Sequence, residues 1–245
     1  MHTSAITRTE ETPNKGFDKV FAFLREQFLA GAIQPGDRLS PERELCLRLG
    51  VSRPVLREAL RALSMLGVVD ILHGVGTVVR RPDTSVLDEF FTFALAQQPD
   101  MADDVLEARI AIECQAIRLA CSRATLADLE RLRAALEDVR RTINDETAGA
   151  TSDYIFHEAL VRAGHAPTLL CLYRAMAPLL HRTHQERRVL VRRYADIKRY
   201  VAEDHERIFE AVVARDEARA DAILRKHFAI GDEYRHRAAT SAVMP

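Results

Sequence analysis

Apolar residues recur at helical spacing along most of this chain, and strand-like alternation is confined to one short stretch near residue 70. In the first third, Ser40 and Ser52 stand where they can cap two short helices, and Pro41 and Pro54 suit the first helical turn. The segment 73–76, with two glycines, then joins two apolar stretches as a hairpin turn. The pattern predicts helices over 15–30, 40–50 and 52–66, followed by strands over 68–72 and 77–80.

Every element predicted after residue 84 is a helix, and glycine becomes rare there. Arg81-Pro82-Asp83 interrupts the pattern and is the expected linker between two domains. Pro178 falls inside the longest predicted helix, where its missing N–H predicts a kink. Seven helices are predicted, over 85–97, 101–121, 125–143, 148–163, 167–192, 194–213 and 216–236. The fold class is therefore mainly α, with one domain over 13–81 and an all-α domain over 85–236.

The charge of the chain is nearly balanced but unevenly distributed. Its 245 residues carry a net charge of -1, with +3 over residues 1–81 and -4 over residues 82–245. A basic unit beside an acidic one suggests an anionic partner for the first. The hydrophobic content of 47% is that of an ordinary globular protein, so a largely disordered chain is excluded.

The sequence carries no signal for export or membrane insertion. No apolar run approaches the roughly 18 residues that a membrane span needs, and the polar N-terminus lacks the apolar region of a signal peptide. The four cysteines are scattered without a CxxC spacing, which favours reduced thiols that pack as small core residues. These features predict a cytoplasmic protein with no membrane partner.

Two short helices followed by a hairpin form the pattern of a winged helix-turn-helix. Arg53 and Arg57 lie four residues apart in the first two turns of the second helix, the part that enters the major groove. Their guanidinium groups suit guanine edges or phosphates, although a pair of arginines is also compatible with a solvated face. Arg61 is expected to point away from the bases. Arg43 at the start of the preceding helix is a further candidate contact with double-stranded DNA.

The N-terminal motifs resemble the GntR superfamily of bacterial transcription regulators. The resemblance rests on Pro35-Gly36-Asp37-Arg38-Leu39, Glu42-Arg43-Glu44-Leu45, Leu49-Gly50-Val51-Ser52-Arg53, Leu56-Arg57-Glu58-Ala59-Leu60 and His73-Gly74-Val75-Gly76-Thr77. It implies DNA contacts by Arg43, Ser52, Arg53, Arg57 and the wing tip His73-Gly74. Ser40-Pro41 reverses the order usual in the family, and Pro54-Val55 stands where a threonine pair usually follows the first arginine. Two hydroxyl donors are thereby lost, and Val55 becomes a candidate contact to a thymine methyl.

Four residues of the second domain have the chemistry of metal ligands. Asp153 and His157 are four residues apart and project from one face of their predicted helix, while His205 and His227 lie on two later helices. Three imidazoles and one carboxylate suit Zn²⁺, Ni²⁺ or a similar ion, although the spacing alone leaves coincidence open. His181 and His184 are a competing pair of candidate ligands. They lie in an arginine-rich stretch whose positive charge would repel a metal ion, so we interpret this pair as part of a solvated face.

The second domain resembles the FadR-like branch of the same superfamily, whose effector domain is called FCD. Residues 106–113 resemble its opening helix, 153–160 its metal helix and 204–212 its third-ligand helix, with His227 in the fourth ligand position. The resemblance implies an antiparallel bundle of six or seven helices that holds a divalent metal ion, zinc or another transition metal such as nickel. The implied ligands are Asp153, His157, His205 and His227, and open coordination positions then accept a small carboxylate effector.

Other polar residues are candidates for the rim of that effector site. Arg109 on the opening helix is the best candidate for a second grip on a carboxylate, with an ion pair to a nearby glutamate as the alternative. Arg162 and Arg174 are weaker candidates. His165 stands where the family usually has asparagine, and we expect it to alter the rim of the pocket.

Together these features favour a DNA-binding transcription regulator, a repressor, controlled by a small organic acid at a metal site. A homodimer on a palindromic operator follows from the resemblance. A metal-sensing regulator would use the same four ligands. A metallohydrolase with an accessory winged helix is disfavoured because no HExxH motif occurs and Glu158 lies about 100° around the helix from His157. We therefore predict that the chain is not an enzyme.

Overall fold

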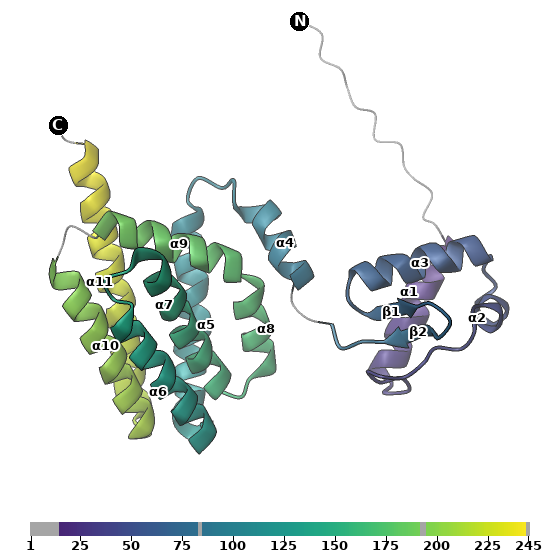
Figure 1. Cartoon of the computed structure of the whole chain (residues 1–245), viewed down its shortest axis with the longest axis horizontal. Helices are drawn as coiled ribbons and strands as arrows, with labels where there is room; N and C mark the ends of the chain where they lie inside the picture. Colours follow the sequence, from purple (N-terminus) through teal and green to yellow (C-terminus); the bar gives the residue numbers. More distant parts are fainter. Residues whose placement is uncertain (1–14, 83–84, 192–194, 244–245) are drawn as a thin grey trace, which may run out of the picture. The chain divides into compact units, whose positions relative to one another are not determined.

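The computed structural model describes residues 15–82, 85–191 and 195–243 (Figure 1). The chain divides into two compact units, with the boundary between residues 86 and 87. The expected linker ends at Asp83, which lies outside the described residues.

The first unit is a winged helix-turn-helix. Its core joins the three helices to the hairpin, and Leu56, Leu60 and Leu63 face that core as expected. The hairpin is antiparallel, with Val69 opposite Val79 and Leu72 opposite Gly76. The elements are α1 (Lys15–Leu29), α2 (Glu42–Leu49), α3 (Arg53–Met65), β1 (Val69–Leu72) and β2 (Gly76–Val79).

The wing needs glycine for two different reasons. Gly74 at its tip has φ of 73°, which side chains rarely adopt. Gly76 has φ of 112°, and a Cβ placed there would lie 3.1 Å from Nε of Arg38. The Arg38 segment pairs with β2, since the Leu39 amide donates to the carbonyl of Thr77 at 2.9 Å. The wing is therefore anchored along β2 and free at its tip, at Gly74.

One local expectation in this unit is wrong. Helix α2 has Pro41 as its N-cap, because the helix begins one residue later than the capping role of Ser40 requires. Val55 is half-buried beside Gly16 of α1, and its contact with a thymine methyl stays a prediction. Ser52 is the N-cap of α3 as predicted, and its side chain makes no capping hydrogen bond. The residue is exposed at the start of α3.

The second unit is helical throughout its described residues and contains eight helices, α4 to α11. The predicted single helix over 167–192 is wrong. It is split into α8 and α9 because Pro178, in the first turn of α9, lacks an N–H and its ring clashes with the carbonyl four residues earlier. The helices are α4 (Ser85–Leu95), α5 (Met101–Arg123), α6 (Leu126–Arg141), α7 (Glu146–Ala163), α8 (Pro167–Ala175), α9 (Ala177–Val191), α10 (Ala195–Val213) and α11 (Glu217–Val243).

Helix α7 lies at the centre of this bundle (Figure 1). It packs against α5, α6 and α9, while α11 packs against α5 and α10. The largest core cluster joins α5, α6, α7, α10 and α11 and includes Ile117, Leu132, Phe156, Ile208 and Phe228. This arrangement brings one face each of α7, α10 and α11 to a common interior position, and that position holds the site.

His165 belongs to the frame of the bundle and not to a pocket rim, which corrects the expectation from the sequence. It follows α7 with φ of 47°, a left-handed conformation in which asparagine is also favoured. Its Nε2 lies 2.7 Å from Oδ2 of Asp128, which also accepts a hydrogen bond from the Thr125 amide in a capping box at the start of α6. The residue therefore joins the end of one helix to the start of another.

The four cysteines are free, and Cys114 and Cys121 are buried as expected. Cys171 is exposed, so the expectation of a core position is wrong for that residue. Within the described ranges, no helix is both long and apolar enough to cross a membrane.

Candidate metal centre and DNA interface

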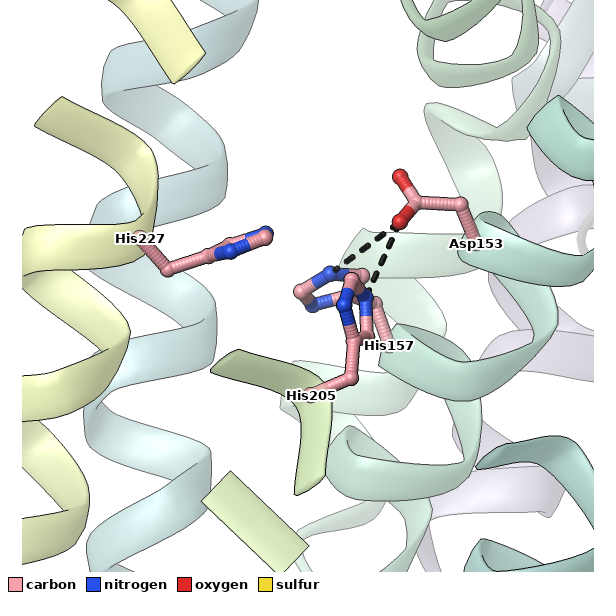
Figure 2. A group of neighbouring side chains, drawn as sticks. All are labelled: Asp153, His157, His205 and His227. Atoms are coloured by element: carbon pink, nitrogen blue, oxygen red, sulfur yellow. Dashed lines mark ion pairs between the residues drawn. The ribbon is translucent and has the colours of Figure 1, made fainter. Parts of the chain in front are cut away.

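The four predicted ligand residues meet in the interior of the second unit. Asp153 and His157 extend from α7, His205 from α10 and His227 from α11 (Figure 2). All four are buried, and one ligand atom from each lies within 4.8 Å of the others. Residues separated by up to 74 positions in the sequence thus form one compact cluster.

The donor atoms converge without satisfying one another. Oδ1 of Asp153 lies 3.0 Å from Nε2 of His205 and 4.0 Å from Nε2 of His157. These three atoms and Nε2 of His227 are buried, and none has a hydrogen-bond partner in the described part of the chain. Leaving such atoms unpaired typically costs about 1–3 kcal/mol each. A divalent cation accepts all four donors at once, so the residues fit a metal ion with three nitrogen ligands and one oxygen ligand.

The opposite nitrogens of two imidazoles are held by a second group. Nδ1 of His157 lies 2.5 Å from Oε2 of Glu113, and Nδ1 of His205 donates to the Val201 carbonyl at 2.6 Å. Such partners typically fix the ring and leave Nε2 for the metal. Nδ1 of His227 lies 3.7 Å from Oδ2 of Asp204, beyond hydrogen-bond distance.

Burial favours the charge states that metal binding requires. It lowers the pKa of His227 from 6.5 to about 4 and holds the pKa of His157 well below its ordinary value. Burial raises the pKa of Asp153, but contacts with His184 and His205 outweigh it and hold that pKa below its usual range. Neutral imidazoles and an ionised carboxylate are the forms that bind a metal ion.

Arg109 is at once an ion-pair partner and a pocket residue. Its Nε donates to Oε1 of Glu113 at 2.6 Å, with both side chains buried, which is the ion-pair alternative left open by the sequence. Its guanidinium lies 4.7 Å from the centre of the Phe228 ring, and Nη2 is buried with no hydrogen-bond partner among the described residues. Glu113 therefore connects Arg109 to His157, a link that sequence spacing alone did not indicate.

A pocket of about 110 Å³ opens beside the cluster. Its walls come from α5, α9 and α11 and include Val105, Leu106, Arg109, Thr183, His184 and Arg187. The carboxylates of Glu186 and Asp232 also line the pocket, so its walls combine apolar side chains with both cationic and anionic groups.

The interpretation of His184 as part of a solvated face is wrong. Its side chain is only 2% exposed, and Nδ1 lies 2.6 Å from Oδ2 of Asp153. Nη2 of Arg187 lies 3.1 Å from the same oxygen. The charged stretch that contains His184 has an exposed side and an inward side. Arg182 and Glu186 pair with each other in solvent, while His184 and Arg187 face inward. His181 is half-buried against the ring of Tyr154.

Arg162 and Arg174, the weaker effector candidates, are held elsewhere. Their guanidinium groups donate to Oε1 of Glu158 at 3.0 and 2.5 Å. Neither residue is among those that line the pocket. Glu158 itself faces away from the ligands, as the helical geometry predicted.

The six candidate DNA contacts are exposed on the first unit. Arg53 and Ser52 mark the start of α3, and Arg57 follows one turn later. Nε of Arg57 donates to Oε2 of Glu42 on α2 at 2.9 Å, which holds the guanidinium between the two helices of the motif. The other exposed candidates are Arg43, His73 and Gly74.

An exposed helix followed by a wing, in a unit separate from a helical bundle with a buried His/Asp cluster, is the architecture of a two-domain winged helix-turn-helix regulator. The description "Bacterial regulatory proteins, gntR family" matches residues 17–79, and "FCD domain" matches residues 104–229. The chain belongs to the GntR family of regulators that carry an FCD domain. It is a DNA-binding transcription regulator and not an enzyme.

Known proteins with the same organisation resemble the chain along most of its length. The HTH-type transcriptional regulator LutR of Bacillus subtilis is 33% identical, covering 80% of this chain and 90% of that protein. The putative L-lactate dehydrogenase operon regulatory protein of Escherichia coli is 32% identical, covering 81% and 76%. A Streptococcus agalactiae GntR structure has a TM-score of 0.67 at 20% identity, covering 89% of this chain and 99% of that one, and so shows a shared fold.

Proposed function

We propose that this protein is a metal-dependent repressor whose affinity for its operator is set by a small organic acid. The observation that carries the proposal is the convergence of four buried ligand residues, within 4.8 Å of one another, beside a pocket lined by Arg109. Asp153, His157, His205 and His227 would hold the ion. Zinc is the expected metal, with nickel or another transition metal as alternatives.

The ligand set accounts for an anionic effector. One carboxylate and three neutral imidazoles leave a bound divalent ion with excess positive charge, and its open coordination positions supply attraction for a carboxylate. Arg109 adds a buried donor, Nη2, that has no partner within the described residues. A carboxylate in the pocket would compensate the charge of the ion and accept a hydrogen bond from Nη2 of Arg109.

The names of two relatives agree with this chemistry. One Escherichia coli relative is named for the L-lactate dehydrogenase operon, and another is the galactonate operon transcriptional repressor, 26% identical over 92% of this chain. Lactate and galactonate are both hydroxy acids. We therefore infer a small hydroxy or related acid as the effector class, and repression as the mode of action.

Control of DNA binding follows from a shift between two conformations of the bundle. In the proposal, a homodimer presents two copies of α3 at the spacing of a palindromic operator. An acid that binds one conformation better than the other changes that spacing in the cytoplasm of the bacterium. A coupling of roughly 1–3 kcal/mol would change operator affinity by about 5–150-fold.

Thermal unfolding of the full chain tests the proposal directly. We expect L-lactate or D-galactonate to raise the melting temperature of the zinc-loaded protein by several degrees, because a ligand of the native state stabilises it. The increase should vanish after treatment with EDTA. Stabilisation by zinc alone, with no response to either acid and metal-dependent operator binding, would instead identify a metal-sensing regulator.

A further inference from the structure

A segment that precedes α2 lies along the wing and carries an arginine. Residues 36–39 form backbone hydrogen bonds of 2.8–2.9 Å with β2, and Arg38 stands directly opposite Val78. Val78 in turn pairs with Asp70 of β1. The wing is thus widened by a third extended segment, and the backbone of Arg38 is fixed to it.

The two faces of this small sheet differ in character. Directly paired residues point to the same face of a sheet, and successive residues along a strand alternate between faces. The inner face is buried in the core and consists of Leu39, Val69 and Val79. Arg38 and Val78 therefore belong to the outer face, together with Gly76, which lies two residues closer to the tip.

The guanidinium of Arg38 lies over Gly76. A Cβ placed at this glycine would be 3.1 Å from Nε and 3.3 Å from Nη2 of Arg38, so the absence of a side chain leaves room for the group. Leu72 pairs with Gly76 across the hairpin and is 45% exposed, and Val75 in the turn is 46% exposed. The guanidinium thus extends along the outer face toward an apolar, exposed tip.

Arg38 supplies an unpaired positive charge that the hairpin itself lacks. Residues 69–79 contain no lysine or arginine, and their one carboxylate, on Asp70, pairs with Arg80 at 3.4 Å. Arg38 is exposed, and its side chain has no ion pair or hydrogen bond in the part of the chain that the structure describes. All of its N–H donors are therefore available to a partner that arrives from solvent.

The place of the wing beside α3 determines what this charge can reach. β1 follows α3 through the segment 66–68 and packs against that helix. When α3 lies in the major groove of DNA, the wing beside it faces the adjoining minor groove. A·T-rich DNA has a narrow minor groove whose negative potential attracts an inserted guanidinium. A G·C pair instead places the amino group of guanine in that groove.

We propose that Arg38 is a DNA contact of this regulator and that it enters the minor groove beside the wing tip, where it selects A·T over G·C pairs. The guanidinium supplies the charge, while Leu72 and Val75 contact the sugars that line the groove. This inference goes beyond the proposed function, since neither a metal ion nor an organic acid takes part in it. It adds a specificity residue that lies outside both helices of the motif.

Selection of duplexes from a pool with a randomised centre tests the preference. The unmodified full chain should enrich a core sequence with A·T pairs beside it. Arg38→Ala should enrich the same core without the A·T pairs. Arg53→Ala, at the start of α3, should instead lose the core. Sequencing of the enriched duplexes measures both features.

Base-pair substitution in the enriched duplex locates the contact. In mobility-shift titrations, replacing the A·T pairs with G·C pairs should weaken binding of the unmodified chain by about fivefold to fiftyfold. Inosine·cytosine pairs lack the guanine amino group in the minor groove, so they should restore most of the affinity. Arg38→Ala should bind all three duplexes alike, with an affinity close to that of the unmodified chain for the G·C duplex.

Two variants control for charge and for side-chain shape. Arg48→Ala removes a guanidinium that lies 4.7 Å from the centre of the Phe23 ring on α1, and it should keep both affinity and preference. Arg38→Lys keeps the charge without the planar guanidinium. It should retain the salt dependence of binding and lose part of the A·T preference. Because Arg38 is exposed, each of its variants should keep the melting temperature of the unmodified chain.

Four results would overturn the proposal. The first is an enriched duplex without A·T pairs beside the core, or an A·T preference that survives Arg38→Ala. The second is binding to inosine·cytosine pairs as weak as that to G·C pairs, which would move the contact to the major groove. The third is an equal loss on every duplex for Arg38→Ala, the mark of a phosphate contact alone. The fourth is the same loss for Arg48→Ala, which would assign the effect to net charge.

Discussion

The two units of this protein use charged residues in opposite surroundings. In the winged helix, Arg43, Arg53 and Arg57 are exposed, and the ion pair between Arg57 and Glu42 has side chains 61% and 37% exposed. In the helical bundle, Arg109 and Glu113 are 3% and 0% exposed. The first unit presents charge to a partner that arrives from solvent, whereas the second holds charge in its interior.

Because of this difference, the charged residues of the first unit should act mainly in binding, whereas those of the second unit should act in folding as well. An exposed arginine contributes little to the stability of its own domain, because water screens its interactions. A buried charge has already lost its hydration, so its partners contribute to both stability and function. Substitutions in the bundle should therefore destabilise the fold, and substitutions in the winged helix should affect DNA binding alone.

The largest effect should come from Glu113→Ala. Removing this carboxylate leaves the Arg109 guanidinium buried without its partner, which typically costs about 3–5 kcal/mol. Chemical denaturation of the full chain would measure the loss. Glu42→Ala removes the exposed partner of Arg57 and should cost less than about 1 kcal/mol. Similar losses for the two variants would contradict the distinction between the units.

Removal of a metal ligand should give the next largest effect. His205→Ala and His227→Ala each delete one of the four converging donors and should lower zinc affinity by more than the 10–100-fold typical of losing an outer partner. Zinc stoichiometry by mass spectrometry and competition with a chelator report the change. His181→Ala is the control. This imidazole of α9 lies against the ring of Tyr154 and is not one of the four ligands, so the variant should keep full zinc occupancy. Unchanged occupancy in a ligand variant would exclude that residue from the set.

Arg53→Ala and Arg57→Ala should weaken operator binding without affecting the fold. Each removes a candidate contact to base or phosphate, worth about 1–3 kcal/mol of binding free energy. Arg61→Ala, on the same helix, should retain binding, because its side chain is expected to point away from the bases. Mobility-shift titration measures affinity, and the melting temperature checks the fold. Normal binding by both variants would contradict the assignment of α3 as the recognition helix.

The most gradual effect is the response of the metal-free protein to pH. His227 has a pKa of about 4 in the fold and an ordinary value of 6.5, so the unfolded chain binds the proton first as the pH falls. Stability should decline below about pH 6.5, by about 1.4 kcal/mol per pH unit for each histidine held neutral, until the pH approaches 4. Denaturation curves at several pH values measure the slope. His227→Phe should reduce it, and an unchanged slope would assign the decline to other groups.

The order of elements was predictable because it depends on local chemistry. Helical periodicity, capping residues and the glycines of the wing each act within a few residues, so the helix–helix–hairpin pattern was visible in advance. The errors are also local in origin. Pro178 splits a helix that periodicity made continuous, and Pro41 takes the N-cap position expected for Ser40.

The ligand set was predicted by resemblance, but its surroundings were not. Glu113 holds the imidazole of His157 from another helix, and Asp204 lies near the imidazole of His227. No spacing rule connects either carboxylate to its histidine. His184 and Arg187 lie in a stretch whose arginines suggested solvent. Only the packing of α9 against α7 decides that one side of this stretch is buried.

Local interactions along the chain thus determine the helices, the wing and the exposed arginines of α3, because each depends on neighbours within a few residues. The buried centre depends on which faces of α5, α7, α9, α10 and α11 meet, and that is set by long-range packing. Burial then gives the residues their properties: it keeps His227 neutral, leaves Nη2 of Arg109 without a partner and places Arg187 beside Asp153. These properties come from desolvation, which exists only once the helices have packed.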